Sequence, residues 1–214
     1  IAIAHQSRRH QEFETALRAI SEDWVGTVSP KSFFNSPKLA ARVDGVEIFV
    51  ETKNDEDNND HTHVTASVQL PPSFAIGKEG AMSGLKRFLG SGDTEIGIES
   101  FDREYLLPAV DDIDMLTRLG ERSRSAISLA IGHRKARLKD GTIRWAGKGI
   151  ITDKYELRGV AETLIELSQA LSDHTGVNSD MLLRHAFGTR ADSDLRFRRT
   201  CFEALLREYP RTEA

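Results

Sequence analysis

Two Asp-Gly dipeptides, each lying between runs of strand-forming residues, constrain the fold of this chain more than any other feature. Asp44-Gly45 separates Leu39–Val43 from Val46–Glu51, and Asp140-Gly141 lies within a run from Lys135 to Ala146. Asp-Gly is a favoured pair for the two-residue turn of a β-hairpin, in which both turn residues take a positive φ. The sequence therefore predicts two antiparallel hairpins in separate parts of the chain.

Segments with helical spacing of apolar residues surround these hairpins. Residues 6–25 carry one apolar stripe and predict a helix that ends at Gly26. A second helix is expected over residues 110–132, split or kinked at Gly120 and closed by Gly132. Asp153 and Glu156 form a capping box that predicts the start of a third helix, with its apolar side supplied by Leu157, Val160, Ala161, Leu164, Ile165, Leu167 and Leu171.

The remaining segments complete an α+β arrangement. His63–Leu70 alternates apolar and polar residues and predicts a third strand beside the first hairpin, and further strands are expected at Thr94–Glu99 and Phe101–Leu107. Residues 77–93 are expected to be a glycine-rich connector with one short helix at 81–89. Because strands and helices are segregated along the chain, the sequence predicts an antiparallel meander and a hairpin packed with several helices, followed by an all-helical tail.

Three regions are expected from this reading. Residues 1–25 form an N-terminal helix that follows a possible membrane segment, residues 26–175 form the α+β domain, and residues 176–214 form a C-terminal helical pair. The membrane reading rests on the apolar run Ile1–Ala4, which is followed by Arg8 and Arg9, because basic residues mark the cytoplasmic end of a membrane span. A tag remnant or the first turn of an ordinary helix is the alternative.

Composition limits the partners and the compartment. The formal net charge is -4 over 214 residues, so a nucleic-acid partner is not expected, although a local basic patch remains compatible with this total. The single cysteine, Cys201, fits a reducing compartment and lies on the apolar side of a tail helix, where a buried structural thiol is expected. We therefore expect a location in the cytoplasm or on the cytoplasmic side of a membrane.

The acidic stretch at residues 53–60 is the candidate metal site. Counted as a calcium loop from Asp55, it has Asp60 where glycine makes the sharp turn and Ala66 where a bidentate glutamate is required. Its remaining candidates are Asp60, His61 and His63, of which the two histidines share one side of a strand. Neither a metal nor any other cofactor is expected. A weak metal-dependent enzyme is the least favoured interpretation.

No pattern in the sequence predicts catalysis. The chain has no G-x-S-x-G elbow and no glycine-rich phosphate loop. We therefore expect no catalytic residues and a role in binding rather than in chemistry.

The second hairpin supplies the candidate binding residues. A two-residue turn at Asp140-Gly141 places Arg137 directly opposite Arg144 on one face, with Lys135 and Lys139 nearby. Like charges opposed across strands are destabilising, so something must offset the repulsion. The offset is expected from an acidic residue elsewhere in the chain, from solvent, or from an anionic partner such as a phosphate, a lipid headgroup, a nucleic acid or an acidic protein surface.

Two stretches resemble known proteins. The run Gly92-Asp93-Thr94-Glu95-Ile96-Gly97 and the later Phe101-Asp102-Arg103-Glu104-Tyr105 are similar to a "GD…FDRRF" motif of uncharacterised, membrane-tethered bacterial proteins, with Glu104 and Tyr105 standing where that family has Arg and Phe. The order of elements over residues 10–172 is also similar. Residues 176–210, with Asp192-Ser193-Asp194 ahead of an Ala/Leu helix, resemble one HEAT-type helical unit.

These resemblances imply a cytosolic interaction domain of a bacterial membrane-anchored protein, with no catalytic residues to transfer. A protein partner is expected, and contact with a membrane surface is a further possibility that the resemblance allows. The alternative that the residues themselves offer is an anion-binding module that uses the basic hairpin face.

Overall fold

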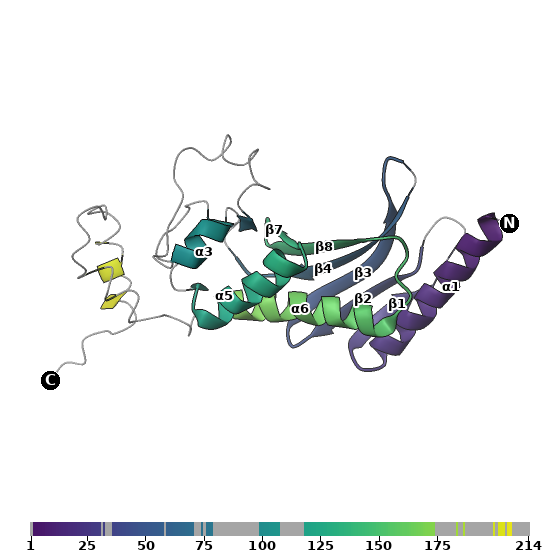
Figure 1. Cartoon of the computed structure of the whole chain (residues 1–214). Coiled ribbons are helices and arrows are strands. Elements are labelled where there is room, and N and C mark those ends of the chain that lie inside the picture. Colours follow the sequence, from purple (N-terminus) through teal and green to yellow (C-terminus); the bar gives the residue numbers. More distant parts are fainter. Residues whose placement is uncertain are drawn as a thin grey trace.

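The computed structural model describes residues 2–30, 32, 36–57, 59–70, 74, 76–78, 99–107 and 118–173, together with residues 183, 186, 199, 201–203, 205 and 206. Its centre is a six-stranded antiparallel sheet, and the long helices α1 (Ala2–Ser21) and α6 (Lys154–Ser172) pack against this sheet (Figure 1). The fold class is therefore α+β, as predicted from the order of the elements.

The sheet combines the two predicted hairpins in one layer. Its spatial order is β1-β2-β3-β4-β8-β7, so the second hairpin joins the edge of the meander beside β4. The strands are β1 (Val25–Ser29), β2 (Lys38–Val43), β3 (Val46–Asn54), β4 (Asp60–Ser67), β7 (Arg137–Lys139) and β8 (Thr142–Lys148). One continuous sheet therefore carries side chains from residues more than 100 positions apart.

Both hairpin turns have the predicted geometry. Asp44 and Gly45 have φ angles of 48° and 86°, and Asp140 and Gly141 have φ angles of 52° and 66°. Positive φ at both turn residues matches the right-handed twist of the flanking strands. The turns fix the register, so that Val43 faces Val46 in the first hairpin and Lys139 faces Thr142 in the second.

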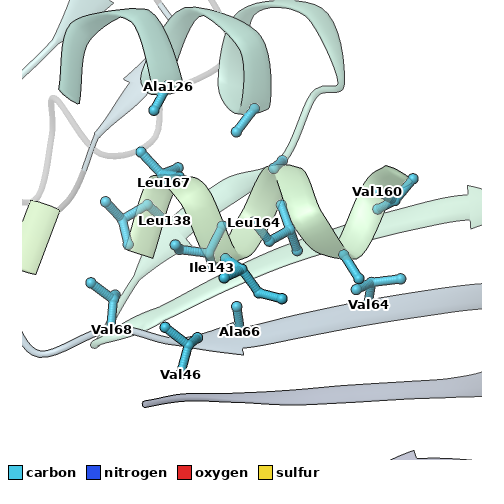
Figure 2. Close-up of a cluster of buried hydrophobic side chains, with 14 of the residues drawn as sticks. Val46, Val64, Ala66, Val68, Ala126, Leu138, Ile143, Val160, Leu164 and Leu167 are labelled. Atoms are coloured by element: carbon cyan, nitrogen blue, oxygen red, sulfur yellow. The ribbon is translucent and has the colours of Figure 1, made fainter. Parts of the chain in front are cut away.

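Helix α6 builds the core on the inner face of the sheet. Asp153 caps it by accepting hydrogen bonds from the backbone N–H groups of Tyr155 and Glu156, which confirms the predicted start. Figure 2 shows the helix lying between the strands and α5 (Glu121–Ile127), with side chains from all three in one buried cluster. Every predicted apolar residue of α6 is buried.

The C-terminal turn of α6 is closed by two side chains from a distant part of the chain. Arg118 donates from Nη1 to the carbonyl of Leu171 at 2.8 Å, and Ser123 Oγ donates to the carbonyl of Ala170 at 2.8 Å. These carbonyls have no partner within the helix, and a cation is favourable at a helix C-terminus. The region around α5 is thereby held to the end of α6.

The predicted first helix is real, but its predicted end at Gly26 is wrong. Helix α1 ends at Ser21, and Gly26 belongs to the edge strand β1, where it faces Ala41 of β2. A Cβ at Gly26 would lie 2.7 Å from the Cβ of Ala41. Gly26 therefore allows two strands to approach each other closely, and it does not end a helix.

The predicted strand at Phe101–Leu107 is also wrong over most of its length. Glu99–Glu104 forms the short helix α3, and only Tyr105–Leu106 is strand (β6), paired with Gly77–Lys78 (β5). Phe101 and Tyr105 stack with their ring centroids 4.7 Å apart. Residues four positions apart share one face in a helix and also in a strand. The spacing of Phe101 and Tyr105 therefore does not distinguish the two structures, and the segment was predicted as a strand.

The break predicted at Gly120 is confirmed, because Gly120 is the residue that precedes α5. The α-helix α5 continues directly into a π-helix, Ser128–His133 (η1), and Arg134 is the residue that follows η1. Gly132 lies inside η1 rather than after it. A π-helix leaves no signature in apolar periodicity that a prediction can use.

Several predictions fall outside the described residues. They are the connector at 77–93 beyond Lys78, its short helix at 81–89, the strand at Thr94–Glu99 before Glu99, and the start of the helix at 110–117. The tail is described only at isolated helical positions, so the predicted helical pair stays a prediction. The division into three regions also stays a prediction.

Candidate functional site

The outer face of the six-stranded sheet is strongly basic. Side chains alternate along each strand, and the positions opposite the buried ones carry seven lysine or arginine side chains and two glutamates, Glu47 and Glu51, a formal net charge of +5. Since the whole chain carries -4, the remaining residues carry -9. The seven basic residues of this outer face are Lys38, Arg42, Lys53, Arg137, Lys139, Arg144 and Lys148.

Arg137 and Arg144 lie opposite each other in the ladder between β7 and β8, as predicted. Both side chains are exposed, and within the described part of the chain neither forms an ion pair with an acidic residue. The in-chain acid considered as an offset is thus not found among the described residues. The next residue along the same row is Thr65 of β4, which faces Arg144 and carries no charge.

The two lysines predicted to flank this pair lie differently. Lys139 is on the outer face, and its Nζ is 3.8 Å from Oδ2 of Asp140 in the turn. Lys135 has a φ of 63° and its Nζ donates to the carbonyl of Gly132 at 2.5 Å, so it caps the end of η1 instead of continuing the basic row. Three of the four predicted residues therefore share one face, and Lys135 does not belong with them.

The basic residues that sequence reasoning missed lie on β2, β3 and β8. Lys38 and Lys53 both contact Glu51, with Nζ to carboxylate distances of 2.9 and 2.5 Å. Partial burial alone would raise the pKa of Glu51, but the hydrogen bonds and charges of these two lysines outweigh it and hold the pKa below its ordinary value. Glu51 is therefore paired with two lysines, and the net charge of the outer face remains positive.

Phe49 places an exposed aromatic ring on this outer face. It lies on β3, and 45% of its surface is exposed. Its neighbours across the ladder are Ala40 on β2 and Thr65 on β4, both small. The row that starts at Phe49 continues through Thr65 to Arg144 and Arg137. The aromatic ring and the arginine pair therefore share one line across the sheet.

The candidate metal ligands lie at the end of the same face. Asp55 orders the loop by accepting hydrogen bonds from the backbone N–H groups of Asp57 and Asn59, and its Oδ2 lies 3.1 Å from Nε2 of His61. The Asn59 N–H is the main cause that holds the pKa of Asp55 below its ordinary value. The rings of His61 and His63 are 6.5 Å apart. Within the described residues, no group of three side chains that could ligate a metal is found. The candidates Asp60, His61 and His63 therefore do not form such a group.

His63 sits among positive charges. Burial lowers its pKa below the ordinary value of 6.5, and the charge of Lys53 lowers it further, with smaller effects from His61 and Arg144. Of the nearby groups only Glu51 acts in the opposite direction. Burial and the positive charges of this face therefore both disfavour the protonated form of the imidazole.

A second group of titratable residues lies beside η1. Lys78 Nζ is 3.0 Å from Oε1 of Glu104, and this contact raises the pKa of Lys78 and lowers that of Glu104. Burial raises the pKa of the neighbouring Tyr105 hydroxyl, and Oη has no hydrogen-bond partner of good geometry among the described residues, although Ser128 and Glu104 lie near enough to influence its pKa. A Cβ added at Gly132 would overlap Tyr105 Oη. This group packs α3 and β6 against η1, and it offers no nucleophile beside a base.

Cys201 is fully buried in the hydrophobic core, which confirms the predicted environment of the thiol.

Comparison with protein-family models, with curated proteins and with solved structures finds no match. The resemblances to membrane-tethered bacterial proteins and to a HEAT-type unit therefore remain predictions. None of the helices within the described ranges is both long and apolar enough to cross a membrane.

Proposed function

We propose that this chain is a binding domain whose functional surface is the outer face of the sheet, and that its partner is a polyanion. The observation that carries the proposal is the Arg137–Arg144 pair, which stands exposed and unpaired among the described residues on a face of formal charge +5. From the sequence we also expect that such a domain is attached to the cytoplasmic side of a bacterial membrane.

The positive charges of the outer face lie close enough to act together on an anion. Adjacent strands are about 4.8 Å apart, so cross-strand neighbours on this face lie within the Debye length of about 10 Å at 0.1 M salt and their potentials add. Opposed like charges cost the sheet about 0.2–1 kcal/mol relative to a neutral pair. An anion bound across the two arginines removes that cost, and guanidinium groups bind phosphate and carboxylate in a bidentate manner.

The inner face and the helices do not offer an equivalent surface. Arg8 pairs with Glu12, Arg18 with Glu14, and Arg158 with both Glu162 and Asp23. Three of the four arginines of α1 and α6 thus have acidic partners, and the fourth, Arg9, donates to the carbonyl of Ile150. This asymmetry supports a role in which one face of the domain meets a negatively charged partner while the other forms the core.

The proposal is tested with linear polyphosphate, a flexible polyanion without bases or lipid tails. Calorimetric titration of the intact chain should show binding that weakens as salt is raised, because phosphate neutralisation releases counterions. The double variant R137S/R144S should bind at least tenfold more weakly. The matched control R8S/R18S removes the same charge from α1 and should bind as the parent does. An equal decrease in both variants, or no binding by the parent, would contradict the proposal.

A further inference from the structure

We propose that the polyanion is a single-stranded nucleic acid, with Phe49 stacking on one base while the arginines of β7 and β8 bind the phosphates. This inference rests on the proposed polyanion-binding function of the same face. It revises the expectation drawn from the whole-chain charge, because the charge of +5 on the outer face is what a nucleic acid would meet.

The position of Phe49 is the first reason. Almost half of the surface of Phe49 is exposed although β3 is an interior strand of the six-stranded sheet, and aromatic side chains stabilise a protein mainly when they are buried. Its ladder neighbours Ala40 and Thr65 have short side chains, and Phe49 remains partly exposed between them. Every base has a flat π-face, so an exposed ring on a basic surface is suited to stack with an unpaired base of any identity.

The spacing along the row is the second reason. Across the sheet, Thr65 lies between Phe49 and Arg144, and Arg137 lies on the far side of Arg144 in the same row. With strands about 4.8 Å apart, the two arginine positions lie roughly 10 and 14 Å from that of Phe49. A stacked strand advances about 3.4 Å per nucleotide, so a chain with one base on Phe49 brings phosphates to both arginines within about four nucleotides.

The charges around Phe49 are the third reason. Glu51, two residues along β3, is neutralised by Lys38 and Lys53, and this leaves one excess positive charge on that side of the ring. Glu47, on the other side, faces Arg42 across the ladder. The acidic residues of the outer face therefore do not close off the path of a phosphate chain past the ring.

The other polyanions fit less well. The bases of a duplex are paired and stacked on each other, so a duplex has no base free to cover Phe49. Binding to an anionic membrane surface combines electrostatic attraction with the insertion of apolar area, and the exposed side chains of Phe49 and Val25 offer the outer face little area to insert. Stacking thus distinguishes a single strand from a duplex, from polyphosphate and from lipid headgroups.

The test uses fluorescence anisotropy of the intact chain with a short labelled single-stranded DNA of mixed sequence. F49A should weaken binding about 5- to 150-fold, the range expected when one base-stacking aromatic is removed. F49L, which keeps an apolar side chain, should weaken it similarly, and F49Y, which keeps the ring, should retain it. Because Phe49 is on the surface, far-ultraviolet circular dichroism should show that all three variants are folded.

The salt dependence gives a second readout. For a single strand the slope of log K against log salt has a magnitude of about 0.7 for each phosphate that the protein neutralises, so R137S/R144S should reduce that magnitude by about 1.4. F49A should leave the slope unchanged, because stacking releases no counterion. The R8S/R18S control should change neither the slope nor the affinity.

The comparison probes separate this inference from the proposal on which it rests. Polyphosphate should bind F49A and the parent equally, and a duplex of the same sequence should bind more weakly than the single strand. If F49A binds single-stranded DNA as the parent does, or if phosphatidylserine vesicles bind and the single strand does not, this inference is overturned while polyanion binding stands. If no probe binds, polyphosphate included, both are overturned.

Discussion

Arg137 and Arg144 lie directly opposite each other on β7 and β8, and no acidic residue of the described chain forms an ion pair with either. The pair belongs to an edge hairpin of the sheet, whose inner side is held by Leu138 and Ile143 in the core. Burial of these two residues keeps the hairpin in place against the repulsion on its outer side. Charge changes on the outer face should therefore alter the stability of the hairpin by only about 0.2–1 kcal/mol.

Reversing one of the two charges should stabilise the protein. Arg144→Glu places a carboxylate opposite Arg137, and an opposite-charge pair across strands is worth about 0.2–1 kcal/mol. The free energy of unfolding in urea should rise by about this amount, while affinity for polyphosphate falls. The double variant R137E/R144E restores a like-charge pair and should lose the gain. A single variant less stable than the parent would show that the repulsion is absent.

Removing the acid beside Phe49 should strengthen binding. Glu47 is exposed on the outer face, and Glu47→Gln makes that face more positive without changing its shape. Affinity for polyphosphate and for single-stranded DNA should rise roughly 1.5- to 5-fold, the effect of one exposed charge interaction. Glu22→Gln makes the same change just after α1, away from the outer face, and should leave affinity unchanged. An equal gain in both variants would indicate a general effect of net charge.

His63 should link binding to pH. Its pKa in the free protein lies below the ordinary 6.5, mainly through burial and the charge of Lys53, with His61 and Arg144 acting in the same direction and Glu51 against them. A depressed pKa means that this group contributes stability above the unfolded pKa, and the contribution is lost as pH falls through the folded pKa. A polyanion bound on the outer face should raise the pKa of His63.

By linkage, affinity for polyphosphate should increase as pH falls through the pKa of His63 in the complex, and His63→Gln should remove part of that increase. The measurement is the titration of the His63 ring resonances by NMR with and without polyphosphate. An unchanged or lower pKa in the complex would place the polyanion away from His63. The His63→Gln variant also identifies the resonance and separates it from that of His61.

Gly132→Ala should destabilise the protein through Tyr105. The added Cβ would overlap Tyr105 Oη across the contact between η1 and β6. Overpacking of this kind costs about 1–3 kcal/mol. In the double variant G132A/Y105F the hydroxyl is gone, so most of the stability should be recovered. Since Tyr105 Oη has no hydrogen-bond partner of good geometry in the part of the chain that the structure describes, Tyr105→Phe alone should change the free energy of unfolding little. A double variant as unstable as Gly132→Ala would contradict this explanation.

Local patterns predicted much of the fold. The Asp-Gly turns set the register of both hairpins down to the Arg137–Arg144 pair, and Asp153 with its capping geometry set the start of α6. These succeed because turn type and helix capping depend on a few neighbouring residues. Gly26 misled, because a glycine after a helix and a glycine at a close strand contact look alike in sequence. Phe101 and Tyr105 misled for the related reason that short segments fit both periods.

The outer face could be predicted only in part. Arg137, Lys139 and Arg144 come from one hairpin, so local register was enough to bring them together. The basic residues of β2 and β3 join them because β8 pairs with β4, and that pairing links segments about 80 residues apart. Sequence alternation shows which residues share a face within a strand, but not which strands are neighbours. The exposure of Phe49 likewise depends on the small residues across from it.

The most direct measurement is a map of amide chemical-shift changes when single-stranded DNA is added to the isotope-labelled chain. Binding on the outer face predicts that the largest changes fall on β3, β4, β7 and β8 around Phe49, Thr65 and Arg144, and that they diminish in R137S/R144S. The exposed sides of α1 and α6 should remain unchanged. Changes centred on the helices, or a spectrum that does not respond to any polyanion, would contradict a functional role for this face.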